Sequence, residues 1–462
     1  LKVNVDQMYG IEVEEFPSLI AQTAIWLTDH QMNMEYSRES GKTFKRLPLT
    51  HSATIVNANA LTTDWKDVVS PSELSFILGN PPFNGSRTMS KEQKDDLLAV
   101  VGNVKEAGFL DFVTGWYFKA TDMMLANPRI QTALVSTNSI SQGEQVSILW
   151  EPLFRKGVCI NFAHQTFKWS NDAKGNAAVY CVIVGFSMTR HKEGRIFEYL
   201  DIRAEPNEVS AKNINAYLIN APSIFIHTMQ KPISNVPEMS FGNMPADGGQ
   251  LLLSQPEKDE LVSVEPRAEQ YILPLISARE FLHNIPRYCL WLVNVEPSEL
   301  RSMPMVLERV SKLREIRLKS SRPQLAGVAS QFAQITQKPD SPFVLIPAHS
   351  SENRQYIPIA LLQAGNVSHN SCLAIPDAQL YHLGVLTSQM HMAWMRAVAG
   401  RLKSDYRYSK DIVYNNFIWP EVSTAQKAEL ETLAQAVLDA RAEFPNSTLA
   451  DLYDPNTMPP IL

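Results

Sequence analysis

The sequence predicts an α/β protein in which an open sheet domain precedes a mixed α+β region. Three observations support this class. In residues 3–195, short apolar runs alternate with amphipathic helical patterns, as in strands connected by helices. From residue 196 to about 375 prolines are scattered and the alternation stops, which indicates a loop-rich second domain. Residues 376–462 return to long helical patterns, which predict a helical C-terminal module.

The opening of the chain predicts a strand, an acidic strand end and a helix. Residues 3–13 alternate and carry Glu12 near their end, and residues 16–30 have helical spacing with Pro17 in the first turn. Residues 31–53 are polar and predict an irregular insertion or a hairpin. Ligands of open α/β sheets bind at the carboxyl ends of strands, where Glu12 is placed to accept hydrogen bonds from a ribose diol. Taken alone, Glu12 fits a capping or solvated carboxylate better.

Two more strand ends follow. Residues 53–61 form one apolar run, and residues 76–78 form another that breaks at Gly-Asn-Pro-Pro-Phe (79–83). Prolines cannot continue a central strand, and Asn80 at such a break offers polar atoms to a small ligand. A plain Asn-Pro turn is an equally good interpretation of this motif by itself. Three strand ends are thus expected on one edge of a parallel sheet.

The rest of the first domain completes the predicted sheet. Residues 111–125 and 145–154 have helical patterns, and residues 130–137 read as a buried strand. Residues 158–162 and 177–186 are apolar strands that predict an antiparallel hairpin at one edge of the sheet. The segment between them is aromatic and polar and contains Phe167 and Trp169.

Basic residues gather at two places in the second part. A helix over residues 305–320 has an apolar face, and its charges are nearly all positive: Arg309, Lys312, Arg314 and Arg317. Such a face is usually only solvated, but charges of one sign favour a phosphate contact. A long helix predicted over 380–402 leads into basic residues between tyrosines: Arg401, Lys403 and Arg407. These suit a nucleic-acid backbone or a domain junction equally.

Composition excludes binding to nucleic acid through overall charge. The 462 residues include 42 basic and 48 acidic ones, so any DNA contact needs a local basic face. The four cysteines are far apart without metal-ligand spacing, which predicts reduced, mostly buried thiols of a cytoplasmic protein and no metal site. No apolar run is long enough to cross a membrane.

An Asn-Pro-Pro-aromatic segment at a strand end has one well-motivated chemical use. The exocyclic amine of adenine is a poor nucleophile because its lone pair is delocalised into the ring. The Asn80 amide oxygen and the Pro81 carbonyl can both accept hydrogen bonds from this amine, which directs its lone pair toward a methyl donor. Phe83 can stack on the base, which must leave the duplex to be reached. Another planar amine, such as a glutamine amide, would suit the same arrangement.

Several long and uncommon stretches resemble the MmeI-like family of type IIL restriction–modification enzymes. Members of this family combine a nuclease, an adenine methyltransferase of the Asn-Pro-Pro-Phe class and target recognition in one polypeptide. The resemblance covers almost the whole chain. Its motifs are Tyr-Gly-Ile-Glu (9–12), Asn-Ala-Leu (59–61) with Asp64 and Trp65, Gly-Asn-Pro-Pro-Phe (79–83), His-Gln-Thr-Phe-Lys-Trp (164–169), Ser-Gln-Met-His-Met-Ala-Trp (388–394), Tyr-Ser-Lys (408–410) and Tyr-Asn-Asn-Phe-Ile-Trp-Pro (414–420).

The resemblance implies domains, partners and roles. It implies a class I, Rossmann-like methyltransferase core in residues 1–195, target recognition in 196–375 and a helical module in 376–462. Double-stranded DNA would be the partner and S-adenosylmethionine the cofactor. The implied roles are ribose binding by Glu12, the border of the cofactor's adenine by Asn59 and Ala60, catalysis and base holding by Asn80, Pro81, Pro82 and Phe83, and the other wall of the base pocket by either Phe167 or Trp169.

The sequence departs from the family pattern at its beginning. The Gly-rich cofactor loop, expected just before Val3, is not in the sequence, nor is the segment that packs on the methionine end of the cofactor. The nuclease with its metal site is not in the sequence either. We therefore expect the methyltransferase core to be incomplete at its N-terminus, and these 462 residues alone to bind S-adenosylmethionine weakly or not at all.

Three alternatives stay open. The chain could act as a DNA-binding module without catalysis. It could belong to a methyltransferase for glutamine or ribosomal substrates, although the large loop-rich second domain and its basic helix argue against that. A purely structural turn at Asn80 leaves the joint presence of Glu12, Asn59 and the aromatic segment unexplained.

Overall fold

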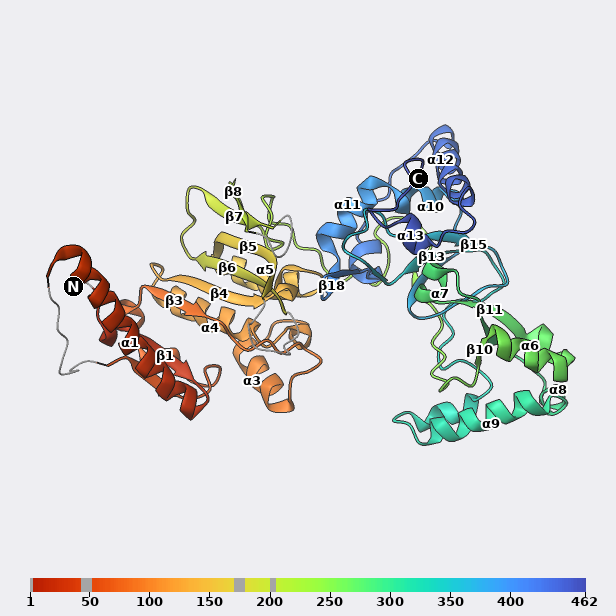
Figure 1. Cartoon of the computed structure of the whole chain (residues 1–462), viewed down its shortest axis with the longest axis horizontal. Helices are drawn as coiled ribbons and strands as arrows, with labels where there is room; N and C mark the ends of the chain where they lie inside the picture. Colours follow the sequence, from red (N-terminus) through yellow and green to blue (C-terminus); the bar gives the residue numbers. More distant parts are fainter. Residues whose placement is uncertain (1–2, 43–51, 170–178, 200–204) are drawn as a thin grey trace. The chain divides into compact units, whose positions relative to one another are not determined.

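The computed structural model describes residues 3–42, 52–169, 179–199 and 205–462 (Figure 1). The chain forms two compact units, residues 1–225 and 226–462, each with its own hydrophobic core. Strands and helices alternate in the first unit, and the second unit mixes short strands with helices. The predicted fold class is confirmed, whereas the domain boundaries at 195 and 375 remain predictions.

The regular elements of the first unit follow one another along the chain. They are β1 (Tyr9–Glu12), α1 (Glu15–Ser40), β2 (Thr54–Asn57), α2 (Trp65–Val68), β3 (Phe76–Gly79), α3 (Lys91–Val101), α4 (Thr114–Ala126), β4 (Gln131–Thr137), α5 (Gln145–Arg155), β5 (Cys159–Trp169), β6 (Val179–Ser187), β7 (Gly194–Glu198) and β8 (Asn207–Ala211).

The main sheet of the first unit has the strand order β3-β4-β6-β5-β7-β8. β3 and β4 are parallel, whereas β6 pairs antiparallel with both β4 and β5. The predicted β5–β6 hairpin is therefore confirmed, but its predicted place at one edge of the sheet is wrong, because β6 also pairs with β4 and β5 also pairs with β7. β5 continues to Trp169 instead of ending at residue 162, because its last residues pair with the start of β6 across a register shift. Residues 170–178, the rest of the predicted aromatic segment, lie outside the described residues.

Aromatic side chains fix the helices on this sheet. Tyr117 of α4 stacks on Phe186 of β6 with ring centroids 5.1 Å apart, and Trp150 of α5 meets Tyr117 edge-on at 5.3 Å. All three are almost completely buried. Burial of side chains of this size stabilises the fold by about 1.5–3 kcal/mol each, so the strand ends are held in place by a well-packed core.

β1 and β2 form a separate parallel pair, with Glu12 opposite Asn57. Within the described residues, no strand pairing joins this pair to the main sheet, so the expected strand ends lie on two sheets instead of one. The prediction of irregular structure from residue 31 is wrong for residues 31–40, because α1 runs to Ser40. These residues are mostly good helix formers, and the helix ends where Gly41 adopts a positive φ of 69°.

The second unit contains short strands between helices. Its elements are β9 (Ser240–Phe241), β10 (Leu252–Ser254), α6 (Gln255–Val264), β11 (Ile272–Ile276), α7 (Ala278–His283), β12 (Arg287–Leu290), α8 (Pro297–Arg301), α9 (Pro304–Leu318), β13 (Phe343–Pro347), β14 (His349–Ser350), β15 (Ala360–Leu362), β16 (Val367–Ser368), β17 (Cys372–Pro376), α10 (Leu380–Thr387), α11 (Gln389–Val398), β18 (Gly400–Leu402), β19 (Asp405–Arg407), α12 (Thr424–Ala442) and α13 (Leu449–Leu452).

Small sheets organise this unit. Their strand orders are β10-β12-β11-β16, β15-β13-β17-β9 and β14-β19-β18. Every residue of β13 is buried, and its core also takes side chains from α10, α11 and the segment that follows β19. The predicted second domain and the predicted C-terminal module thus share one core.

The single helix predicted over residues 380–402 is wrong. Ser388 has an extended backbone (ψ 153°), so α10 stops at Thr387, and its side chain accepts a hydrogen bond from the His391 N–H to begin α11. The chain then continues into β18 after residue 398. Met392 and Met395 of α11 are buried in the core of this unit, whereas Met390 is 72% exposed.

The cysteines and the acidic and histidine side chains agree with ordinary globular packing. All four cysteines are buried and free, as predicted. In the described parts of the chain, no three or more His, Cys, Asp and Glu side chains gather as a group that could hold a metal ion. Among the described helices, none combines the length and the apolar character needed to span a bilayer.

Candidate active site

Except for Phe83, the predicted cofactor and catalytic residues line one cavity of the first unit, with a volume of about 840 Å³. We call it the strand-end cavity. β1 and β3 both end at it, and α3 and α4 supply further walls. The predicted site residues that line it are Glu12, Asn59, Ala60, Asn80, Pro81 and Pro82. Phe83 is half-buried but is not among the lining residues.

Glu12 lies where β1 turns toward α1. The Asn57 side-chain amide donates to the main-chain carbonyls of Glu12 and Val13 at 3.0 and 2.9 Å, which fixes this turn. The Glu12 Oε1 accepts the Glu14 N–H at 3.1 Å. The carboxylate is therefore a half-buried acceptor at the border of the strand-end cavity, as a ribose-binding role requires.

Asn59 and Ala60 form a tight turn after β2. The Asn59 Oδ1 accepts the Leu61 N–H at 2.9 Å, and its Nδ2 donates to the Asp96 Oδ2 at 2.7 Å. The Trp65 Nε1–H donates to the Ala60 carbonyl at 2.8 Å. These contacts give the turn one conformation and attach it to α3.

The Asn-Pro-Pro segment follows β3 at a point where the backbone packs closely against β4. Gly79 is the last residue of the strand, and a Cβ there would lie 3.1 Å from the Leu134 side chain of β4. Pro81 is buried, whereas Asn80 is exposed at the cavity. The proline that follows disfavours helical backbone angles at Asn80, whose side chain is exposed at the cavity.

Asp111, which the sequence interpretation missed, holds the segment that follows the Asn-Pro-Pro-Phe motif. Its Oδ1 accepts the Ser86 N–H at 2.9 Å, and its Oδ2 accepts the hydroxyls of Ser139 and Thr137 at 2.5 and 3.3 Å. The next residue also contributes, since the Phe112 N–H donates to the Asn84 carbonyl at 2.9 Å. This buried carboxylate therefore ties the segment just after the Asn-Pro-Pro-Phe motif to the end of β4.

Phe167 and Trp169 lie at the same end of the main sheet as the Asn-Pro-Pro segment that follows β3. In the register of the sheet, Phe167 lies opposite Cys181, which lies opposite Thr137 at the carboxyl end of β4. Neither aromatic residue lines the strand-end cavity. Trp169 is 42% exposed, and its ring centroid lies 6.1 Å from that of Phe167.

Two aromatic residues that the sequence interpretation missed extend this group. Tyr199 stacks on Phe167 with centroids 5.4 Å apart, and Phe197 stacks on His164 at 4.2 Å. The His164 Nδ1 and the Tyr199 hydroxyl share a hydrogen bond of 2.9 Å. Burial lowers the pKa of His164, so the ring is neutral near pH 7. Phe197 lies on β7 and Tyr199 directly follows this strand, and local spacing does not reveal that they meet His164 and Phe167.

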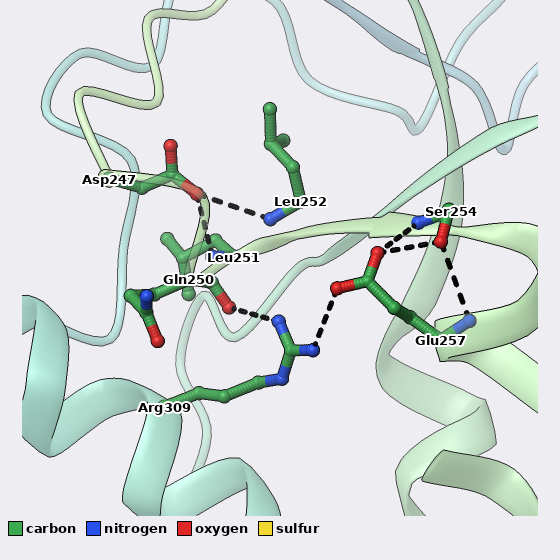
Figure 2. A network of polar contacts seen from close by, with 7 residues as sticks. All are labelled: Asp247, Gln250, Leu251, Leu252, Ser254, Glu257 and Arg309. Carbon is green, nitrogen blue, oxygen red and sulfur yellow. Dashed lines mark hydrogen bonds and ion pairs between the residues drawn. The ribbon is translucent and has the colours of Figure 1, made fainter. Parts of the chain in front are cut away.

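Arg309 of α9 does not face solvent as predicted for a DNA contact. Figure 2 shows its guanidinium donating to the Gln250 carbonyl and paired with Glu257, both at 3.1 Å. Glu257 also accepts the Ser254 N–H at 2.8 Å, while Asp247 accepts the N–H groups of Leu251 and Leu252 (Figure 2). The network connects α9 to α6 and β10.

The prediction of a phosphate contact is wrong for Arg317. Its side chain is only 2% exposed, and its guanidinium donates to main-chain carbonyls of Pro245, Ala246, Leu325, Val328 and Gln331. A side chain with its donors used inside the protein cannot bind a phosphate. Lys312 and Arg314 of the same helix are exposed, and Lys312 pairs with Glu308 at 2.7 Å.

The other basic group lies on the β18–β19 hairpin. Arg401 is half-buried over the Tyr406 ring, donates to the Ser404 carbonyl at 2.7 Å and lies 3.7 Å from Glu352. Lys403 in the turn and Arg407 on β19 are exposed. A phosphate could approach these two basic side chains, although Asp405 on β19 is exposed as well.

Comparisons with known proteins assign all three regions. Family models match the MmeI DNA-methyltransferase domain over residues 1–198, the MmeI target recognition domain over 220–421 and the MmeI C-terminal domain over 422–462. DNA methyltransferase A of Bacillus subtilis (strain 168) is 41% identical over 464 residues, which are 99% of this chain and 52% of that protein. The chain thus spans about half the length of this curated relative.

A solved structure agrees with these matches. The Type IIL restriction–modification enzyme MmeI, in complex with DNA, superposes with a TM-score of 0.93 at 48% identity, over 100% of this chain and 62% of that chain. The chain belongs to the MmeI family, and it carries the family's DNA-methyltransferase, target recognition and C-terminal domains.

Proposed function

We propose that the protein is the methyltransferase and recognition part of a restriction–modification enzyme, and that it methylates the exocyclic amine of adenine in double-stranded DNA. S-adenosylmethionine would be the methyl donor. The observation that carries the proposal is the strand-end cavity, where Glu12, the turn at Asn59 and Ala60, and the Asn80-Pro81 pair meet. Membership in the MmeI family, with MmeI itself solved in complex with DNA, supports DNA as the substrate.

The cavity fits the cofactor in size and in chemistry. Its volume of about 840 Å³ lies within the range of small-molecule sites. The Glu12 carboxylate would accept hydrogen bonds from the ribose hydroxyls, and Ile11, Val13 and Ile77 offer apolar surface to the adenine ring. When bound, S-adenosylmethionine supplies a methyl group on a positively charged sulfur.

The catalytic segment would bind and orient the target amine. Two acceptors, the Asn80 side-chain oxygen and the Pro81 carbonyl, would draw the amine toward tetrahedral geometry, and no strong base is needed for that step. The base would have to leave the duplex and stack on Phe83. Phe167 or Trp169, on the same sheet edge, would cover the other face of the ring.

The second unit would hold the duplex. The exposed Lys312 and Arg314 of α9, with Lys403 and Arg407 of the β18–β19 hairpin, are the proposed contacts to the DNA backbone. Such contacts position a duplex without specifying its sequence. A protein that acts on cellular DNA and keeps four free cysteines would work in the cytoplasm.

Sequencing of modified bases tests the proposal. DNA from cells that express the natural protein containing these 462 residues should carry methylated adenine in one short asymmetric motif. Asn80→Ala should lower methylation by on the order of 10²–10³-fold, because an acceptor of the reacting amine is lost. DNA binding in gel shifts should stay unchanged. Modified cytosine, unmodified DNA, or full methylation by the Asn80→Ala variant would contradict the proposed function.

A further inference from the structure

The turn after β2 uses its own hydrogen-bond acceptors. The Asn59 carbonyl accepts both the N–H and the hydroxyl of Thr63, at 3.0 and 2.8 Å, and the Asn59 Oδ1 accepts the Leu61 N–H. The Ala60 carbonyl accepts the Trp65 indole N–H. A ligand amine entering the strand-end cavity at this turn therefore meets acceptors that already have partners.

Asp96 brings a stronger acceptor to the same place. It lies on α3, is half-buried and lines the strand-end cavity. Its Oδ2 accepts the Asn59 Nδ2–H at 2.7 Å, while a carboxylate has about four acceptor sites in all. Hydrogen bonds to an ionised group are roughly twice as strong as neutral ones. The amide of Asn59 thus holds a carboxylate that keeps capacity for a further donor.

We propose that the Asp96 carboxylate accepts a hydrogen bond from the exocyclic amine of the cofactor's adenine. This contact would make the cavity selective for a 6-aminopurine over a 6-oxopurine. This inference rests on the proposed function, which assigns the cofactor to the strand-end cavity. Asn59 then acts as a positioning residue, since its side chain orients the Asp96 carboxylate and its own acceptor closes the turn.

Glu92 is the one rival carboxylate on this side of the cavity among the described lining residues. It lies one helical turn before Asp96 on α3, so both point to a common side. Glu92 is exposed, and hydrogen bonds from its own backbone N–H and from the Ser90 side chain lower its pKa. The Asn59 side-chain amide donates to Asp96, which distinguishes Asp96 from Glu92 at this turn.

Asp96→Asn reverses the proposed preference without a change in size. The amide keeps one oxygen for the Asn59 Nδ2–H and presents an NH₂ group, a donor, to the cavity. Binding of S-adenosylhomocysteine and of S-inosylhomocysteine, in which an oxygen replaces the 6-amino group, is measured by calorimetry on the natural protein containing this chain. The wild type should prefer the amino compound by about tenfold or more, and the variant should lose or invert that preference.

A matched control and a rival variant make the result decisive. Asp95→Asn makes the same chemical change at the neighbouring exposed position of α3 and should leave the preference unchanged. An unchanged preference in Asp96→Asn with intact binding, or a loss of preference in Glu92→Gln instead, would overturn the inference and leave the proposed function standing. If the wild type binds neither compound, the proposed function fails, and the inference fails with it.

Discussion

The strand-end cavity and helix α9 were both predicted from residue types in a pattern, with different outcomes. Residues from three separated motifs, at positions 12, 59–60 and 80–82, line one cavity. On α9 the four predicted basic contacts divide: Arg317 is buried, Arg309 is paired inside the unit, and Lys312 and Arg314 are exposed. The strand-end residues thus lie together at one cavity, whereas two of the four predicted basic residues of α9 are withdrawn from solvent.

The difference has a geometric cause. A residue just after a strand must lie at an edge of a sheet, and parallel strands bring their carboxyl ends to the same side. A helix offers several faces, and the packed one is not fixed by its charges. On α9 the buried residues are Val306, Leu313 and Arg317, whereas Ile316 and Leu318 of the expected apolar face are exposed. Val306 and Leu313 of the predicted apolar face are thus buried as expected, and the packed face also takes in Arg317, one turn after Leu313.

Replacing Arg317 and Arg314 of α9 one at a time tests this comparison with the largest expected effect. Arg317→Met should lower the free energy of unfolding by about 3 kcal/mol or more, because it leaves several buried carbonyls without donors. Arg314→Met should change it by less than about 0.5 kcal/mol, since that side chain is exposed. Denaturant unfolding followed by tryptophan fluorescence measures both.

The two variants should also differ in DNA binding. Arg314→Met should weaken binding about equally for all sequences and reduce the slope of log affinity against log salt by about one. Equal stabilities of the two variants would contradict the structural role of Arg317, and an unchanged salt slope would remove Arg314 from the DNA contacts.

Asp111 offers the next test, on the side of the cavity. Asp111→Ala leaves the Ser86 N–H and two hydroxyls without their acceptor. The segment just after the Asn-Pro-Pro-Phe motif therefore loses its attachment to β4. We expect methylation to fall by about 10²-fold through kcat, because small displacements at a reacting centre have effects of this size. The KM for the cofactor should stay unchanged, as Asp111 does not line the cavity.

Asp111→Asn provides the rescue. It keeps an oxygen for Ser86 N–H, and the hydroxyls of Thr137 and Ser139 can turn to accept from the new amide. It should recover most of the methylation. Asp122→Ala, at an exposed position of α4, is the control. A rise in KM in place of a fall in kcat, or no recovery in the asparagine variant, would show that Asp111 does not act by positioning this segment.

Asp111 and Asp96 show why part of the site could not be predicted. Asp111 was interpreted as the start of a helix, and its partners lie 25 to 28 residues away on both sides. Asp96 lies on an ordinary amphipathic helix 37 residues after Asn59. Glu12 and Asn80 could be found because each terminates a strand in a short motif. A side chain that acts through long-range contacts leaves no such local pattern.

The fold shows the same division between local and long-range information. The β5–β6 hairpin followed from two apolar runs that are close in sequence. The end of α10 before Ser388 could not be predicted, because Ser388 lies in a continuous helical pattern. Its side chain caps the N-terminus of α11 instead of continuing α10. The separation of β1 and β2 from the main sheet also had no local signal.

The smallest expected effect concerns Glu257, the partner of Arg309. Hydrogen bonds from the Ser254 N–H and hydroxyl, together with Arg309, lower its pKa from 4.5 to about 2. A carboxylate with a lowered pKa in the folded state stabilises that state above its unfolded pKa, and this contribution is lost as the pH falls from 4.5 toward 2. The Glu257 side chain is 42% exposed, so solvent screening keeps the contribution below about 1 kcal/mol.

The free energy of unfolding of Glu257→Gln should therefore lie below that of the wild type above pH 4.5, and the two values should converge as the pH falls toward 2. Unfolding curves taken at several pH values measure this difference. Glu260→Gln, on an exposed position of α6, should follow the wild type throughout. Because Arg309 also donates to the Gln250 carbonyl, it should stay in the network, and DNA affinity at neutral pH should not rise. A clear rise in affinity would mean that Glu257 keeps Arg309 from a phosphate, and α9 would then present the DNA-binding face that its sequence predicts.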